Sequence, residues 1–277
     1  MDKIQTILAA LVVGLLVIAT VFYFLGSGAS ARKLASKYYK PTFLVVGANG
    51  AGKTSFFYSL LAKQTALTVS SLELNVTSIS LPFANPSILA QYQFIDYPGH
   101  LKYSQLLRKL IVDDITVPKL KGVVYVVDSS SQSLTQEGKI TAMAKELFSL
   151  LSLTEKIPNG VDFLFAINKQ DLFDSRPVFK VKQMLEEELA RLISDELNSK
   201  GLTRGGSGID NDDEDDSDSF NKEETTREFW RSVVGSGKFR FEMLEGNMEF
   251  IGGSVLKNKV SNWENWFDEK AVNYGGM

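Results

Sequence analysis

The chain has 277 residues, of which 44% are hydrophobic and 23% are charged, values typical of a globular protein rather than a disordered or fibrous one. It has no cysteine and a single histidine, His100, which excludes disulfides, zinc–thiolate sites and any multi-histidine metal site. The net charge is only −3, so direct nucleic-acid binding is not expected. Seven acidic groups lie within residues 210–218, which leaves the rest of the chain at about +4.

The first feature along the chain is an uncharged apolar run of nineteen residues, from Ile7 to Leu25. As a helix rising ~1.5 Å per residue, this run would be about 28 Å long, close to the ~30 Å hydrocarbon core of a bilayer. Lysine and arginine occur in residues 26–40 and no acid does, so the positive-inside rule places the C-terminal side in the cytosol. The pattern therefore predicts a transmembrane helix at 7–25, a short N-terminus at 1–6 on the other face, and a basic juxtamembrane linker at 26–40.

A cleaved signal peptide is the competing interpretation of this segment, because Ala29-Ser30-Ala31 resembles a small-residue cleavage site. The apolar run is longer than the core of a signal peptide, and the residues before it are barely basic, which favours an uncleaved anchor. The remaining residues, 41–277, are then one cytosolic domain.

That domain begins with an apolar segment, 42–46, which runs directly into a complete G-x-x-x-x-G-K-[ST] loop at 47–54. In such a loop the backbone N–H groups converge on the phosphates, the lysine reaches the β- and γ-phosphates, and the Ser/Thr hydroxyl ligates Mg²⁺. The residues that follow suit a helix whose N-terminus also favours an anion. The predicted phosphate-binding residues are Gly47, Ala48, Asn49, Gly50, Ala51, Gly52, Lys53, Thr54 and Ser55.

A second strand-like segment ends in Asp-Tyr-Pro-Gly-His at 96–100, which contains the D-x-x-G element of GTPases, although this pattern alone is also that of a turn. In GTPases Asp96 would organise Mg²⁺ through water, and the Gly99 N–H would contact the γ-phosphate. His100 stands where Ras-like proteins carry the glutamine that orients water, so it is a candidate catalytic residue or a switch-loop residue that contacts a partner. A switch threonine, Thr68 or alternatively Thr65, is expected at Mg²⁺ and the γ-phosphate.

The guanine-selecting element is the N-K-x-D sequence at 168–171, which directly follows an apolar segment. The Asp171 carboxylate can accept two hydrogen bonds from the N1–H and the exocyclic amine of guanine, whereas adenine presents no such pair of donors. Asn168 is expected to brace the loop, and the stem of Lys169 to lie along the face of the base. Together with the phosphate loop, this element predicts a site for GTP or GDP with Mg²⁺.

A degenerate form of the fifth GTPase element, commonly Ser-Ala-Lys, occurs at 254–256. Ser254 matches the serine of that element, but Val255 and Leu256 replace its alanine and lysine. Ser254 and Val255 are therefore candidate contacts of the guanine base.

The order of the segments is typical of an α/β P-loop NTPase G domain with a six-stranded, mostly parallel, doubly wound sheet. The expected strands are 42–46, 72–81, 91–95, 122–128, 161–167 and 248–252, and the expected helices are 53–63, 101–113, 133–152, 178–198 and 258–271. A hairpin links the second and third strands. Residues 199–227, glycine-rich and then acidic, are interpreted as a disordered insertion, or alternatively as an acidic segment that docks a basic partner.

These features together resemble the beta subunits of the eukaryotic signal recognition particle receptor, which are ARF-like members of the Ras superfamily with an N-terminal transmembrane helix. The resemblance covers nearly the whole chain. It rests on the D-x-P-G-H form at 96–100, Thr-Val-Ser at 68–70, Val-Val-Asp-Ser at 126–129 and Asn-Trp-Glu-Asn-Trp-Phe at 262–267. Asp2 stands where ARF proteins carry a myristoylated glycine, so a spanning helix replaces the lipid.

The resemblance implies a single-pass protein of the endoplasmic reticulum membrane, with a lumenal N-terminus, that binds the receptor's alpha subunit in its GTP state. Through that heterodimer it would act indirectly on the ribosome–nascent chain complex and the translocon. A slow GTPase is expected, because no arginine finger is identifiable and Ras-type enzymes without one hydrolyse GTP at roughly 10⁻⁴ s⁻¹. Two other functions stay open: an ARF-like trafficking GTPase with a transmembrane anchor, and a binding module in which GTP is structural and is not turned over.

Overall fold

The computed structural model describes residues 40–64, 67–85, 90–136, 138–198, 216–235 and 237–274, and four separate positions near the N-terminus, 13, 14, 16 and 20. The chain divides into two units, Met1–Tyr39 and Lys40–Met277, and the fold below is that of the second. The predicted transmembrane helix at 7–25 and linker at 26–40 lie almost entirely outside the described residues. Among the residues that are described, no helix is long and apolar enough to cross a membrane.

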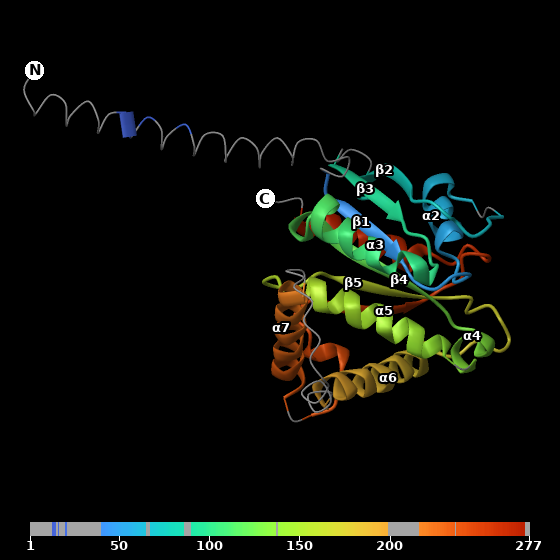
Figure 1. Cartoon of the computed structure of the whole chain (residues 1–277). Helices are drawn as coiled ribbons and strands as arrows, with labels where there is room; N and C mark the ends of the chain where they lie inside the picture. The colour runs from blue at the N-terminus through green and yellow to red at the C-terminus, as the bar shows by residue number, and fades with distance from the viewer. Residues whose placement is uncertain are drawn as a thin grey trace, which may run out of the picture. The chain divides into compact units, whose positions relative to one another are not determined.

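One six-stranded sheet with the strand order β2-β3-β1-β4-β5-β6 forms the centre of the second unit. β2 and β3 are antiparallel and the other neighbouring strands are parallel. The bounds are β1 Thr42–Val46, β2 Asn75–Leu81, β3 Ala90–Asp96, β4 Leu120–Asp128, β5 Phe163–Asn168 and β6 Met248–Gly252. Helices cover both faces of the sheet (Figure 1). The predicted α/β fold and its six-stranded, mostly parallel sheet are therefore confirmed.

The helices are α2 Lys53–Ala62, α3 Ser104–Lys109, α4 Ser131–Thr135, α5 Lys139–Thr154, α6 Val178–Asn198, α7 Asp216–Val234 and α8 Ser261–Tyr274. The single helix predicted at 101–113 is instead a 3₁₀ turn, the short α3 and a π-helical segment, Leu110–Ile115. The helix predicted at 133–152 is divided into α4 and α5. Gly138 separates them because its φ of +81° does not fit a right-handed helix.

The central strands are buried on both faces, as expected for apolar parallel strands. On one face, Phe43 of β1 packs edge-on against Phe267 of α8, with ring centroids 5.1 Å apart. Phe56 of α2 meets Trp263 of α8 in the same way at 5.2 Å. This aromatic cluster fixes α2 and α8 against β1, and so holds the loop at the end of β1 in place.

A helix that the sequence does not predict, α7, occupies the second part of the segment interpreted as a disordered insertion. The prediction is wrong for residues 216–227, and residues 199–215 lie outside the described residues. The cause is tertiary packing: Trp230 is fully buried, stacks on Phe148 of α5 at 5.1 Å, and donates from Nε1 to Ser152 Oγ at 2.8 Å. The polar residues before Trp230 extend a helix whose anchor lies just beyond them.

Candidate functional site

The phosphate loop joins β1 to α2 at the carboxyl end of the strand, where ligands bind in open α/β sheets. Gly47 and Gly52 have φ values of +132° and +99°, a region that L side chains rarely adopt. A Cβ on Gly47 would lie 2.3 Å from the Val126 carbonyl oxygen, and one on Gly52 would lie 2.3 Å from Asn168 Nδ2. The loop's own conformation therefore requires glycine at both positions.

Lys53 is buried beneath this loop, and its ammonium donates a hydrogen bond of 2.9 Å to the Ala48 carbonyl oxygen. Burial lowers the pKa of Lys53, and the carboxylates of Asp96 and Glu146 oppose that shift. Gly99 lies directly against the ammonium, since a Cβ there would be 2.4 Å from Lys53 Nζ. The predicted phosphate-binding groups Lys53 and Gly99 thus converge on one buried, cationic place.

Thr54 and Asp96, the predicted Mg²⁺ groups, are in direct contact. Thr54 Oγ1 donates to Asp96 Oδ2 at 2.8 Å, and Asn75 Nδ2 donates to the same oxygen at 2.9 Å. Asp96 Oδ1 is buried and has no hydrogen-bond partner in the described part of the chain. Burial raises the pKa of Asp96, against the hydrogen bonds from Asn75 and Thr54.

The residues present fit a magnesium ion shared with phosphates, because a hydroxyl and an orphaned carboxylate oxygen are the hard donors that Mg²⁺ prefers. Within the described residues, no group of three or more His, Cys, Asp or Glu side chains is placed to hold a metal. The protein therefore offers part of a coordination sphere, and phosphate and water oxygens would have to complete it.

Of the two candidates for the switch threonine, Thr68 is described, and its hydroxyl contacts Ser55 rather than Thr54. Thr68 Oγ1 lies 2.6 Å from Ser55 Oγ, and the hydroxyl next to Thr54 is that of Ser71, at 3.0 Å. Ser71, which is not among the residues predicted from the sequence, also accepts from Asn75 Nδ2 at 2.9 Å. The alternative threonine, Thr65, lies outside the described residues.

A cavity of about 130 Å³ lies between the phosphate loop and the switch segments. It is lined by Asn49, Gly50, Gly52, Lys53, Thr54, Ser55, Thr68, Val69, Ser70, Ser71, Tyr97, Pro98 and Gly99. His100 is exposed outside this lining, and its Nδ1 accepts the Lys102 N–H at 3.2 Å. In a neutral imidazole this contact places the proton on Nε2.

Asn168 ties the base-selecting loop to two others. Its Nδ2 donates to the Ala51 carbonyl oxygen of the phosphate loop at 2.9 Å, and its Oδ1 accepts the Val255 N–H at 3.1 Å. Asn168 is buried, and so are Ala51 and Val255. The Val255 N–H, a predicted contact of the base, is therefore already bonded to protein.

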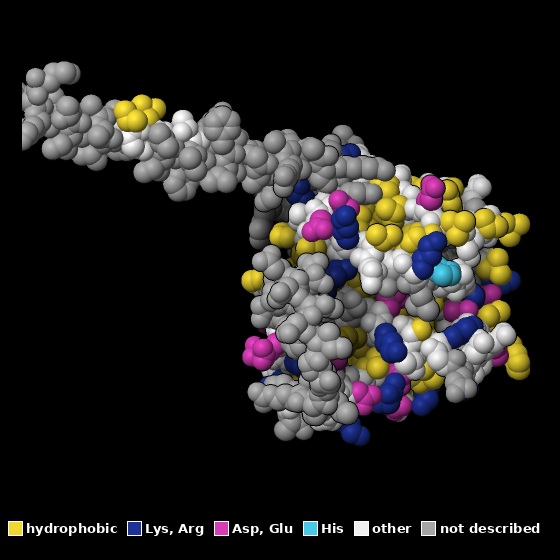
Figure 2. Space-filling model, in the orientation of Figure 1, with side chains coloured by type: hydrophobic (Ala, Val, Ile, Leu, Met, Phe, Trp, Pro, Cys, Tyr) yellow, Lys and Arg dark blue, Asp and Glu magenta, His cyan; other side chains and the backbone are white. Residues whose placement is uncertain are grey.

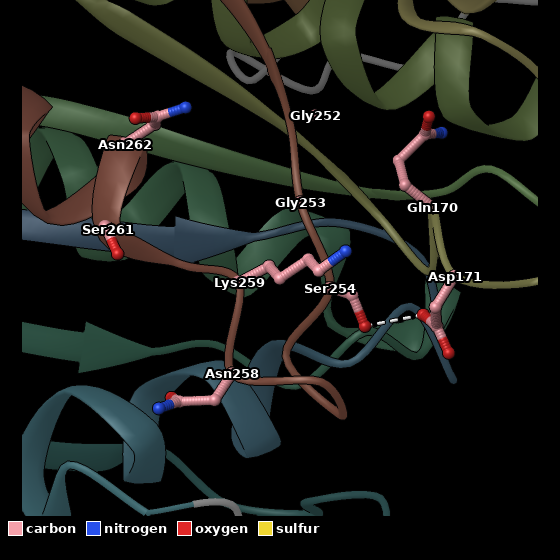
Figure 3. Close-up of a pocket in the computed structure, with 9 residues that line it drawn as sticks. All are labelled: Gln170, Asp171, Gly252, Gly253, Ser254, Asn258, Lys259, Ser261 and Asn262. Atoms are coloured by element: carbon pink, nitrogen blue, oxygen red, sulfur yellow. Dashed lines mark hydrogen bonds between the residues drawn. The ribbon is translucent and has the colours of Figure 1, made fainter.

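Asp171 lies at the rim of an open depression of about 510 Å³ beside the end of β6. Ser254 Oγ donates to Asp171 Oδ1 at 2.5 Å, and the other carboxylate oxygen of Asp171 points away from Ser254 (Figure 3). The Ser254 hydroxyl thus fixes the rotation of the carboxylate predicted to read guanine. The depression is lined by Gln170, Asp171, Gly252, Gly253, Ser254, Asn258, Lys259, Ser261 and Asn262.

Lys169 makes a contact that the sequence does not predict. Its φ is +63°, and its ammonium pairs with Asp128 Oδ2 at 2.6 Å. Asp128 ends β4, in the Val-Val-Asp-Ser run at 126–129.

A glycine-rich phosphate loop after β1, a threonine–aspartate pair beside it and an N-K-x-D loop after β5 define a Ras-type P-loop domain. The family model of the signal recognition particle receptor beta subunit matches residues 38–247 of this chain. Signal recognition particle receptor subunit beta of Saccharomyces cerevisiae is 32% identical over 266 residues, which cover 92% of this chain and 96% of the yeast protein. The Rattus norvegicus protein of that name is 31% identical over 149 residues, 54% of this chain and 51% of the rat protein. The chain belongs to the signal recognition particle receptor beta subunit family.

Solved structures of similar proteins have the same fold. The mammalian SRP receptor structure aligns with a TM-score of 0.60 at 23% identity, covering 83% of this chain and 100% of that one. The SRb–GDP–Mg structure from Chaetomium thermophilum aligns with a TM-score of 0.54 at 26% identity, covering 83% of this chain and 97% of that one.

Proposed function

We propose that this chain is the membrane-anchored, GTP-binding subunit of a signal recognition particle receptor, and that it holds the receptor's alpha subunit in a GTP-dependent way. The observation that carries the proposal is the Asn168 side chain, which fastens the base-selecting loop to the phosphate loop through the Ala51 carbonyl. One guanosine nucleotide can then span both loops. The Chaetomium thermophilum relatives are described as complexes with GDP, with GDP and Mg, and with GTP and SRX.

In this proposal the residues divide by the part of the nucleotide that they hold. Asp171 reads the guanine edge, Ser254 orients its carboxylate, and Lys169 covers the ring. The phosphate loop at 47–55 and the Gly99 N–H surround the phosphates. Thr54, Thr68 and, through water, Asp96 are the groups that would hold Mg²⁺, whose role is to neutralise phosphate charge.

A partner surface borders the nucleotide cavity. Leu67, Val69 and Leu72 expose 101%, 86% and 73% of their surface, and Val69 also lines the cavity. Hydrophobic side chains gather on the face that carries His100, the single cyan side chain (Figure 2). Exposed apolar clusters mark interaction sites, and Val69 belongs both to this cluster and to the cavity lining, which supports a nucleotide-sensitive contact with the alpha subunit.

Hydrolysis is proposed to be slow without a partner. Of the described residues that line the cavity, none is an arginine, and Lys53 is the one cationic side chain among them. His100 would orient the attacking water only after the switch loop carries its ring inward. A binding module that never hydrolyses GTP would have the same nucleotide contacts as a GTPase switch. Measured hydrolysis rates distinguish these two functions.

The family membership and the apolar run at 7–25 support the proposed anchor and location. We place the G domain in the cytosol on a single-pass anchor in the endoplasmic reticulum membrane, where the heterodimer would receive ribosome–nascent chain complexes at the translocon.

The experiment is capture of the purified alpha-subunit N-terminal domain by the full chain in detergent, loaded with GTP or with GDP. Capture with GTP that is lost with GDP is expected. Equal capture in both states would contradict a GTP-dependent interaction. Single-turnover hydrolysis with and without the bound domain and ribosomes then separates the switch from the module, because a rate that no partner accelerates would exclude the switch.

A further inference from the structure

The Val-Val-Asp-Ser run at 126–129 has no part in the nucleotide contacts proposed above, yet its aspartate is placed beside the guanine-selecting loop. Asp128 is the last residue of β4 and pairs in register with Asn168, the last residue of β5. The next residue along the chain from Asn168 is Lys169, so Asp128 faces the lysine of the N-K-x-D element across two neighbouring strand ends.

The Asp128 carboxylate is fully engaged in this position. Its Oδ2 accepts from Lys169 Nζ at 2.6 Å and from Ser133 Oγ at 2.8 Å, and its Oδ1 accepts the Ser130 N–H at 2.9 Å. The side chains of Asp128 and Lys169 are 13% and 34% exposed. Burial alone would raise the pKa of Asp128, but hydrogen bonds from Lys169, Ser130 and Ser133 outweigh it and hold that pKa below its ordinary value. The carboxylate is therefore ionised at neutral pH.

Ser129, the residue after Asp128, holds the backbone next to Lys169 by hydrogen bonds. Ser129 donates to the Asn168 carbonyl oxygen twice, from Oγ at 2.6 Å and from N at 3.1 Å. The Ser129 carbonyl oxygen in turn accepts the Arg176 N–H at 2.7 Å. Ser129 thus holds the start of the guanine-selecting loop at Asn168 and the chain five residues beyond its end at Arg176, and Asp128 holds the Lys169 side chain within the loop.

We propose that Asp128 is a positioning residue of the guanine site: it fixes the Lys169 ammonium so that the lysine stem lies as a flat platform against the purine ring. The proposal rests on the guanine-nucleotide binding proposed above. A free lysine would lose much rotamer freedom when it covers a base, and the partly buried ion pair imposes most of that loss before the nucleotide arrives. The charge-assisted bond to a partly buried carboxylate is strong enough to do so.

The test is a double-mutant cycle on nucleotide dissociation, measured with ribose-labelled fluorescent GTP and GDP on the full chain in detergent. Asp128→Asn and Lys169→Met each remove the ion pair, and the methionine keeps an unbranched stem. Each is expected to speed dissociation about tenfold, the range of a lost charged hydrogen bond, and the double variant is expected to be no faster than the faster single variant. Asp174→Asn is the matched control, because Asp174 is exposed in the same loop and contacts Ser131 through its backbone carbonyl.

A base-dependent readout separates positioning from simple loss of structure. Asp128→Asn should weaken the binding of GTP and of inosine triphosphate by the same factor. It should leave the binding of ribose 5′-triphosphate, which has no base, unchanged. Weakening of all three ligands, additive effects in the cycle, or an unchanged dissociation rate would each overturn the proposal. If Asp128→Asn does not fold, the comparison is between Lys169→Arg, which keeps the ion pair, and Lys169→Met, which removes it. Lys169→Arg should release nucleotide at the wild-type rate and Lys169→Met should release it faster. Equal dissociation rates for these two variants would overturn the proposal. If the wild-type chain binds no guanine nucleotide, the proposed function itself is refuted. If the wild type binds GTP and Asp128→Asn releases it at the same rate, only this inference is refuted.

Discussion

Replacing Asn168 by alanine tests the coupling between the phosphate loop and the base-selecting loop. The substitution removes the donor to the Ala51 carbonyl oxygen and the acceptor of the Val255 N–H, at 2.9 and 3.1 Å. Both partner residues are buried, so water cannot easily replace the amide. A buried polar group left without a partner costs about 1–3 kcal/mol, and two such groups predict a loss of about 2–6 kcal/mol from the free energy of unfolding.

The assay is urea unfolding of the nucleotide-free chain in detergent, followed by tryptophan fluorescence, with dissociation of labelled GTP measured in parallel. The midpoint should fall with an unchanged slope, and GTP should leave faster because the two loops are no longer joined. Asn198→Ala is the control: Asn198 is exposed at the end of α6, and its loss should change stability by less than about 0.5 kcal/mol. If Asn168→Ala behaves like this control, the bridging role of Asn168 is wrong.

Further predictions concern the base, the metal site, α7 and the anchor. Asp171→Asn should shift preference from GTP to xanthosine triphosphate in competition binding, and unchanged GTP affinity would contradict its role. Burial raises the pKa of Asp96, so its ionised form opposes folding at neutral pH and ceases to do so as pH falls through that raised pKa. Asp96→Asn should therefore stabilise the nucleotide-free chain by about 1 kcal/mol at pH 7, and this gain in stability should disappear in acid. The same variant should lose Mg²⁺-dependent GTP binding. A variant that is less stable than the wild type at pH 7 would refute this reasoning. Trp230→Ala should cost about 3–5 kcal/mol and expose α7 to protease, and protection equal to wild type would show that α7 is held otherwise. Arginine at both Leu15 and Leu16 should release the full chain from membranes on alkaline extraction, because each charge costs about 3 kcal/mol at the centre of a spanning helix, and retention would argue against the anchor.

The motifs that could be predicted from the sequence are those whose chemistry needs neighbouring residues. The phosphate loop and the N-K-x-D loop each act through consecutive backbone and side-chain groups, so their spacing alone identifies them. Contacts between distant segments leave no such pattern. Lys169 hydrogen-bonds to Asp128, from which it is separated by 41 residues in the sequence. Trp230 hydrogen-bonds to Ser152, from which it is separated by 78 residues. For α7, composition was misleading, because one buried tryptophan outweighs a polar, acidic stretch that would not fold by itself.

The strand and helix bounds show a similar division. The buried parallel strands β1 and β5 are short apolar runs, and all six strands of the sheet begin and end within three residues of the predicted bounds. The segment after the D-x-x-G element is less regular than its helical pattern suggests, and Thr116, with a φ of +65°, ends it before β4. Such a backbone is set by packing against the sheet rather than by local preference.

The buried charged groups of the candidate nucleotide site are held at a cost, and that cost would link the stability of the chain to ligand binding. Lys53 and Asp96 are buried with pKa values displaced toward their neutral forms, and Asp96 Oδ1 has no partner among the described residues. A phosphate would neutralise the lysine, and a cation would satisfy the carboxylate, so ligand binding removes both penalties at once. The chain should therefore gain stability from GTP and Mg²⁺ together that neither gives alone, because each ligand compensates the charge that the other leaves unpaired.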